Sequence, residues 1–140
     1  MDICCYNRPF DDQSQMRIRL ETEAKLYIQE NIKNGGYSLT WSYMLDYENA
    51  NNPYEDKRNA ISPWKSIACH YCKSSNAIYT EGIKLMASGI DSKDALHISC
   101  AMSADCGYFI TTDHKLLNKE LNRIRIINPI DFVVETESLI

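Results

Sequence analysis

The sequence lacks any long apolar run, which argues against a chain that crosses a membrane. No stretch approaches the roughly 20 consecutive apolar residues that a membrane-spanning helix requires, and no charged region followed by an apolar stretch begins the chain. We therefore expect a cytoplasmic location. Internal repeats, linkers and low-complexity segments are lacking too, so the 140 residues are expected to form one domain, residues 1–140.

An excess of positive charge is also lacking, because the formal net charge is −4. This balance argues against a protein that binds nucleic acid through a broad basic face. If RNA is the substrate, metal ions must offset the local negative charge. Hydrophobic residues make up 44% of the chain and charged residues 24%, which is typical of a folded globular protein rather than a disordered one.

Six cysteines are present, and most of them lie inside apolar runs. We interpret them as reduced, buried thiols rather than as a disulfide framework. Cys69 and Cys72 have the spacing of half a zinc site, but no second pair with this spacing stands elsewhere, because Cys4 and Cys5 are adjacent. We therefore expect Cys69 and Cys72 to pack on an apolar helix.

Apolar periodicity and turn residues predict alternating strands and helices along most of the chain. The expected strands are 2–6, 37–41, 108–112 and 124–127. The expected helices are 12–33, 42–51 with Ser42 as its cap, several segments within 53–89, then 91–104, 114–121 and one that begins at Pro129. This alternation predicts the α/β class, as a three-layer α/β/α sandwich around a mostly parallel central sheet.

In open α/β sheets, ligands bind beyond the carboxyl ends of the strands, which is where Asp113 is expected. Asp113 follows the strand 108–112, so it is either a ligand-binding acid or simply the cap of the next helix. Asp94 begins the most apolar helix of the chain, a place where the helix dipole alone favours an acid. His97, one turn further on, is either a core histidine bonded to a carbonyl or a residue that orients Asp94.

Glu48 shares a helical stripe with Trp41, Met44 and Leu45, because these residues fall at i, i+3, i+4 and i+7. Burying an unpaired carboxylate is costly, so such a residue usually has a cation or a hydrogen-bond donor beside it. The alternative is a residue at the edge of the stripe that reaches water. Carboxylates from separate elements suit Mg²⁺ or Mn²⁺, which offset their mutual repulsion and activate water for phosphodiester hydrolysis.

Four segments carry ordered acidic motifs of a known family. They are Asp2-Ile-Cys-Cys-Tyr-Asn-Arg-Pro-Phe10, Tyr43-Met-Leu-Asp-Tyr-Glu-Asn49, Gly89-Ile-Asp-Ser-Lys-Asp-Ala-Leu-His97 and Tyr108-Phe-Ile-Thr-Thr-Asp113. Through them the sequence resembles, over nearly its whole length, PIN-domain proteins, the group that contains the VapC-type toxins. The resemblance implies a metal-dependent endoribonuclease in which Mg²⁺ or Mn²⁺ is bound by the acids Asp2, Glu48, Asp94 and Asp113, with Thr112 and His97 in support.

The resemblance further implies an RNA substrate, an antitoxin protein that holds the chain inactive, and a homodimer. Two positions depart from the family pattern. Only Met1 precedes the first acid, where the family has a strand of several apolar residues, and Ile3 stands where Thr or Ser is common.

Two rival functions stay open. One is a catalytically impaired PIN-like module that binds RNA or a protein partner, and metal-dependent cleavage of RNA would separate it from the nuclease. The other is a receiver-like signalling domain, which would require phosphorylation of an aspartate.

Overall fold

The computed structural model describes residues 1–137, with Ile3 described by its backbone alone. Helices form most of this part of the chain. The elements of the first half are α1 Ile3–Asn7, the 3-10 helix η1 Arg8–Phe10, α2 Met16–Lys33, β1 Thr40–Ser42, α3 Tyr43–Ala50, α4 Glu55–Ile61 and α5 Trp64–Ile67. Those of the second half are β2 His70–Cys72, α6 Asn76–Ala87, α7 Ser92–Ser103, β3 Tyr108–Ile110, α8 His114–Leu117, β4 Arg125–Ile127 and α9 Pro129–Glu137.

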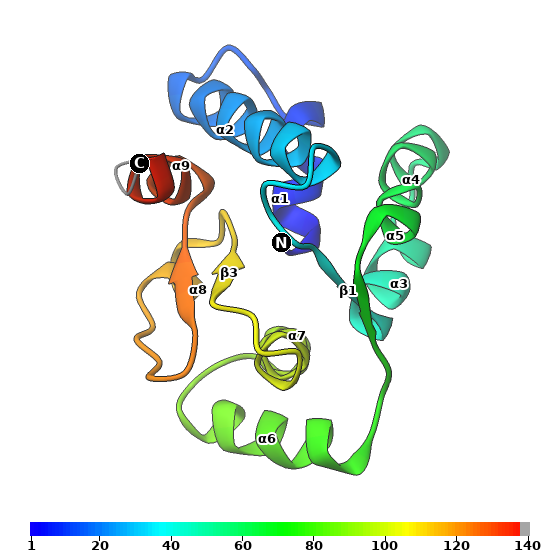
Figure 1. Ribbon diagram of the computed structural model, residues 1–140, viewed down its shortest axis with the longest axis vertical. Helices are drawn as coiled ribbons and strands as arrows, with labels where there is room; N and C mark the ends of the chain where they lie inside the picture. The colour runs from blue at the N-terminus through cyan, green and yellow to red at the C-terminus, as the bar shows by residue number, and fades with distance from the viewer. Residues whose placement is uncertain (138–140) are drawn as a thin grey trace.

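The strands form two separate parallel pairs, and this arrangement contradicts the predicted sandwich. Thr40 of β1 is paired with His70 of β2, and Tyr108 of β3 is paired with Arg125 of β4. Within residues 1–137 no strand joins the two pairs, which lie apart in Figure 1. The predicted α/β class, with a three-layer α/β/α sandwich around a mostly parallel central sheet, is therefore wrong. The observed fold is a mainly helical domain that encloses two short parallel strand pairs.

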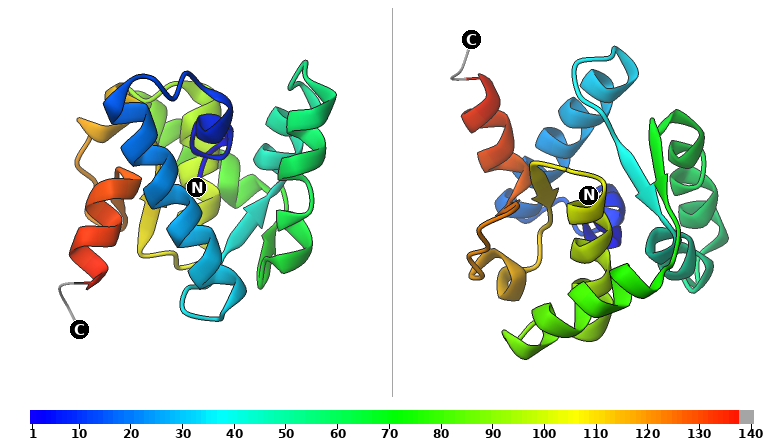
Figure 2. Two further views of the ribbon diagram at one scale, coloured as in Figure 1. Left: turned by 90° about the horizontal axis from the view of Figure 1, so that it is seen from above. Right: turned by 60° about the horizontal axis from the view of Figure 1, so that its bottom comes forward.

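The predicted strand 2–6 is instead helix α1, and the reason is local. The Asp2 carboxylate accepts a hydrogen bond from the Cys5 amide at 3.0 Å, which makes Asp2 the N-cap of α1. Such a cap stabilises a helix start by about 1 kcal/mol, and here it outweighs the β-propensity of the run from Ile3 to Tyr6. The Asp2 amide donates to the Ile110 carbonyl oxygen at 3.1 Å. The amino terminus consequently lies between β3 and β1, as the views of Figure 2 show.

The stretch 53–89 contains α4, α5 and α6, as predicted, together with strand β2, which the sequence analysis missed. Cys72 is buried on β2, and Cys69 is exposed just before it, so this pair does not lie on an apolar helix. All six cysteines are free, but Cys4 and Cys69 are exposed rather than buried. Strand β2 forms by pairing with the distant strand β1. The spacing of apolar residues along the chain does not indicate such a pairing.

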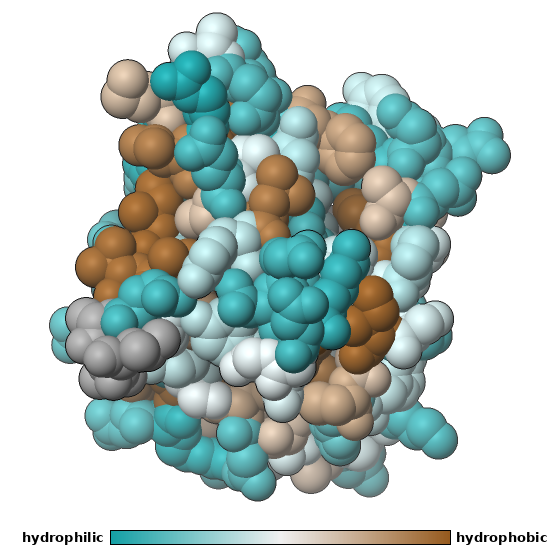
Figure 3. All heavy atoms as spheres, turned by 45° about the horizontal axis from the view of Figure 1, so that its top comes forward, coloured by the Kyte–Doolittle hydropathy of each residue, from teal (hydrophilic) through white to brown (hydrophobic). Residues whose placement is uncertain are grey.

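Helix α7 is a buried helix, as its apolar composition predicts. Ala95 and Ile98 are fully buried, and they share one core cluster with Leu85 of α6 and Phe109 of β3. Apolar side chains also reach the surface, and Figure 3 shows them as patches among polar residues on one face. No helix within residues 1–137 is both long enough and apolar enough to cross a membrane.

Helix α2 is present near its predicted bounds, and charged residues stand among its buried positions. Met16 is 66% exposed and Leu20 46% exposed, whereas Glu21, Lys25 and Ile28 are buried. Periodicity located the helix but not its orientation, because the apolar positions in its first half do not face the core. The charged residue Glu21 takes the place that an apolar side chain would normally fill.

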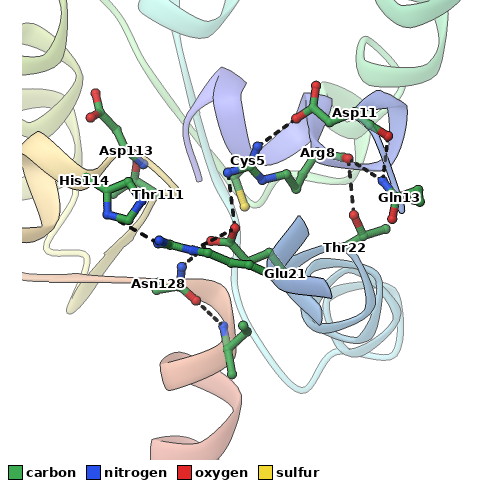
Figure 4. Close-up of polar contacts among 12 residues, drawn as sticks. Cys5, Arg8, Asp11, Gln13, Glu21, Thr22, Thr111, Asp113, His114 and Asn128 are labelled. Carbon is green, nitrogen blue, oxygen red and sulfur yellow. Dashed lines mark hydrogen bonds and ion pairs between the residues drawn. The ribbon is translucent and has the colours of Figure 1, made fainter. Parts of the chain in front are cut away.

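Glu21 is fully buried and holds three elements together. Its carboxylate lies 3.2 Å from Arg8 Nη2 of η1 and 3.5 Å from Arg17 Nε, and it accepts a hydrogen bond from Asn128 Nδ2. Figure 4 shows this group around Glu21. Asn128 also accepts a hydrogen bond from the Ile130 amide at 2.8 Å, at the start of α9. The buried charge is thus paired, as a carboxylate without access to water requires.

Candidate metal centre

The predicted acids lie on separate elements that meet around the first turn of α1. Asp2 caps α1, Glu48 lies in α3, Asp94 is in the first turn of α7, and Asp113 caps α8. The Cys4 thiol lies near all four acids. Burial raises the pKa of this thiol to about 12, and the charges of the four acids raise it as well. The four predicted carboxylates therefore lie within electrostatic range of Cys4.

Asp2 is the most buried of these acids, with 3% of its surface exposed. Burial raises the pKa of Asp2, while hydrogen bonds from Thr111 and the Cys5 amide oppose the rise. The Thr111 hydroxyl donates to Asp2 Oδ2 at 2.5 Å and accepts from the Asp113 amide at 3.0 Å. Thr111 thus links the first acid to the last.

Thr112 is the predicted supporting hydroxyl, but Thr111 is the threonine that contacts the acids. Thr112 is buried, and among the described residues no hydrogen bond joins it to the acids. Two adjacent threonines on a strand point to opposite sides, and the sequence alone does not say which of them faces the carboxylates. The hydrogen bond from the Thr111 amide to the Ile127 carbonyl oxygen fixes that register.

Glu48 and Asp94 carry strongly perturbed carboxyl groups. Burial raises the pKa of Glu48 to about 7, the charges of Asp2 and Asp94 add to the rise, and Lys93 opposes it. Burial also raises the pKa of Asp94 to about 6, helped by the charges of Asp2 and Asp113. These mutual effects mean that the cluster resists full ionisation at neutral pH.

His97 lies against Glu48, and no hydrogen bond joins it to Asp94 among the described residues. It is 4% exposed, and its Nε2 lies 3.4 Å from Glu48 Oε1 without a hydrogen-bond partner of good geometry among the described residues. Its ring meets the edge of Phe109 at a centroid distance of 5.5 Å. Burial lowers the pKa of His97 to about 3, so the imidazole is neutral at pH 7.

Asp113 is partly exposed and also acts as a helix cap. Its Oδ1 accepts a hydrogen bond from the Lys115 amide at 2.9 Å, at the start of α8. Next to it, His114 Nδ1 lies 3.4 Å from Arg17 Nη2. Capping does not exclude a second role, since only one carboxylate oxygen takes part in this bond and the charge of Asp113 acts on Asp2 and Asp94.

The donor types suit a hard divalent cation, because all four predicted ligands are carboxylates. The side chains are close enough to influence one another, but they do not converge on a single point. Within residues 1–137, no three His, Cys, Asp or Glu side chains are arranged to hold a metal ion. Binding of an ion would therefore require some of the carboxylates to rotate, including Asp2, whose two oxygens are engaged by Cys5 and Thr111.

Comparison of the chain with family models, curated proteins and solved structures gives no significant match. A function is therefore inferred from the acids and their surroundings, together with the resemblance of the four segments that contain them.

Replacing Glu48 by glutamine should stabilise the protein increasingly as the pH rises from about 5 to 7.5 without metal. The Glu48 pKa is about 7 in the fold, against an ordinary 4.5. Between these values the folded chain binds the extra proton, so this group's contribution to stability falls as the pH rises. Allowing for the partial exposure of Glu48, the difference in unfolding free energy between the variant and wild type should change by about 2 kcal/mol from pH 5 to pH 7.5.

Urea denaturation in EDTA at pH 5 and pH 7.5 measures this difference. Glu23→Gln, at an exposed position on α2, is the matched control. Its unfolding free energy should equal that of wild type at both pH values. A stability difference for Glu48→Gln that stays constant across this range would contradict the perturbed carboxyl group.

Proposed function

We propose that this chain is a divalent-metal-dependent endoribonuclease whose Asp2, Glu48, Asp94 and Asp113 bind Mg²⁺ or Mn²⁺. The observation that carries the proposal is the buried, mutually repelling set of these acids, because burial raises the pKa of Asp2, Glu48 and Asp94 and neighbouring charges add to the rise. Like charges in one place cost folding free energy, and such groups are found most often where a ligand or a reaction uses them. A bound cation would offset this cost.

Such an ion, when bound, activates water and neutralises the charge that develops on a phosphodiester in hydrolysis. The chain's own residues orient the ligands. The Thr111 hydroxyl holds one oxygen of Asp2, and the Thr111 side chain fixes the amide of Asp113. His97 is neutral and its Nε2 lies 3.4 Å from Glu48 Oε1, so we assign it the role of orienting the Glu48 carboxylate. Thr111 and His97 are therefore positioning residues in this proposal.

The surroundings of Asp113 accord with an RNA substrate. Arg17 and His114 lie in contact beside it, and Lys115 follows directly. Arg17 and Lys115 supply local positive charge in a chain whose formal net charge is −4. Phosphate contacts of this kind position a nucleic acid without reading its sequence.

The resemblance extends the proposal to partners and location. By analogy with the family, we infer that the chain is the toxin of a toxin–antitoxin pair, with an antitoxin protein as its partner, and that it forms a homodimer. The six free thiols accord with a reducing compartment such as the cytoplasm.

A second candidate function is a catalytically impaired module that binds RNA or a protein partner. The engagement of both Asp2 oxygens favours it, because a ligand already held by Cys5 and Thr111 is less available to an ion. The two functions differ in one measurable respect: the impaired module binds RNA without cutting it.

Addition of millimolar Mn²⁺ should raise the melting temperature and should switch on cleavage of a labelled RNA. A ligand that binds only the folded state adds about 2.7 kcal/mol of stability at a hundredfold excess over its dissociation constant. The experiment compares Mn²⁺ with EDTA in melting curves and in cleavage assays on the same protein. Retention of the labelled RNA without cleavage would favour the impaired module, and an unchanged melting curve with no cleavage would contradict the metal centre.

A further inference from the structure

A cavity of about 460 Å³ lies between the two strand pairs. Thr40 and Ser42 of β1 line one side of it, and Tyr108 and Ile110 of β3 line another. None of the four acids of the proposed metal centre lines this cavity, but Met1 and His97 do, so the cavity adjoins the metal centre without containing its acids. Its volume is within the range of about 300 to 1,000 Å³ that is common for binding sites in proteins. We call this cavity the strand slot.

One backbone edge of β1 faces the strand slot. The Leu39 carbonyl oxygen accepts a hydrogen bond from the Cys69 amide at 3.0 Å, so the polar backbone groups of Leu39 point toward β2. These groups alternate in direction along a strand. The groups of Thr40 therefore point away from β2, toward the slot that Thr40 lines.

The edge of β3 follows the same rule. Its neighbours Gly107 and Thr111 are bonded to Arg125 and Ile127 at the two ends of β4, so the backbone groups of Tyr108 and Ile110 point the other way. The Ile110 carbonyl oxygen confirms this direction, because it accepts the Asp2 amide at 3.1 Å. Apart from Asp2, no described residue supplies a backbone partner on these two edges.

The backbone groups and side chains that face the strand slot indicate what kind of molecule it binds. Backbone amides and carbonyls that face a cavity require hydrogen-bond partners, which a small apolar molecule lacks. An extended polypeptide offers donors and acceptors on both of its edges at the spacing that the strands require. The helices around the slot contribute apolar side chains, among them Ile28 and Ile32 of α2, Leu45 of α3 and Phe132 of α9. An inserted strand would therefore be apolar at successive positions, as buried parallel strands are.

We propose that the strand slot binds an extended apolar segment of a partner polypeptide, inserted between β1 and β3. The segment would donate to and accept from Thr40 on one side and Tyr108 on the other, and it would also accept from the Ile110 amide, because the Ile110 carbonyl oxygen is already bonded to Asp2. Insertion of a donated strand is an established mode of peptide recognition, in which the main chain supplies affinity and the apolar side chains supply selectivity. The inference is independent of the proposed ribonuclease activity.

A synthetic peptide of five β-branched apolar residues, with two lysines at its amino end for solubility, tests the proposal. Saturating peptide should slow the exchange of the Thr40, Tyr108 and Ile110 amides at least about tenfold, because these amides gain partners. The amides of Trp41 and Phe109 point toward β2 and β4, so their exchange should change much less. The melting temperature should rise in parallel.

The matched control is the same peptide with proline at its third position, which removes one amide and suits a central strand poorly. Unchanged exchange with the first peptide, or equal protection by both peptides, would overturn the proposal. Protection that appears with no peptide as the protein concentration is raised would assign the slot to a second copy of this chain and would also overturn it.

Discussion

Asp113→Asn and Asp94→Asn are each expected to abolish metal-dependent RNA cleavage while leaving the metal-free fold as stable as wild type, or slightly more stable. Asparagine keeps the shape of the side chain but removes the negative charge that a divalent cation requires. Loss of an outer-shell partner already costs roughly 10- to 100-fold in metal affinity or activity, so loss of a ligand should cost at least that much. Cleavage of a labelled RNA with Mn²⁺ measures the effect.

The stability of these variants separates a metal ligand from a helix cap. Asn and Asp cap helices about equally well, so a cap-only Asp113 would be replaced with little change in either stability or activity. A buried member of a repelling cluster should instead give a higher melting temperature in EDTA when its charge is removed, because burial raises the pKa of Asp94 and the charges of its neighbours add to the rise. Activity and metal-free stability should therefore move in opposite directions.

Asp56→Asn is the matched control for these two variants, since Asp56 is an exposed acid in the first turn of α4. It should cleave RNA at the wild-type rate. Cleavage near the wild-type rate in Asp113→Asn, with the control also active, would count decisively against the nuclease.

Glu21→Gln is expected to lower the free energy of unfolding by about 3 to 5 kcal/mol, the usual cost of breaking a buried ion pair from one side. The change removes the charge that faces Arg8 and Arg17, and among the described residues it leaves Arg8 with only the partly exposed Asp11 as an ionic partner. The hydrogen bond from Asn128 would also weaken. Urea denaturation measures the loss.

Glu23→Gln provides the comparison, because it makes the same chemical change two residues away at an exposed position of α2. It should alter the unfolding free energy by less than about 0.5 kcal/mol. A Glu21→Gln protein as stable as Glu23→Gln would show that the group around Glu21 contributes little to the fold.

Elements with strong local signals were predictable from the sequence. Ser42 caps α3 as expected, through a 3.4 Å hydrogen bond from the Leu45 amide. The apolar composition of α7 and the proline at the start of α9 placed those helices nearly correctly. These signals act within one or two turns of the chain, so they do not depend on the rest of the fold.

The sheet was not predictable, because its extent depends on contacts between distant residues. The run from Ile3 to Tyr6 has the composition of a strand, but the carboxylate of Asp2 turns it into a helix. With that run helical, the two strand pairs stay apart. The four acids were selected from their positions in the chain and from the family resemblance, and their role as a site stays a prediction. Thr111 and Glu21 have no local signal in the sequence, and only their contacts with Asp2 and Arg8 in the fold single them out.

The order in which the chain folds follows from where its contacts fall in the sequence. Each parallel pair closes within one contiguous stretch, 40–72 and 108–127. By contrast, the contact between Thr111 and Asp2 spans 109 residues and that between Asn128 and Glu21 spans 107. Contacts of such separation carry the largest loop-closure entropy and are slow to form. Each strand pair can therefore assemble early, whereas Asp2 reaches the other acids only when the two ends of the chain meet, so a partly folded chain would hold no complete carboxylate cluster.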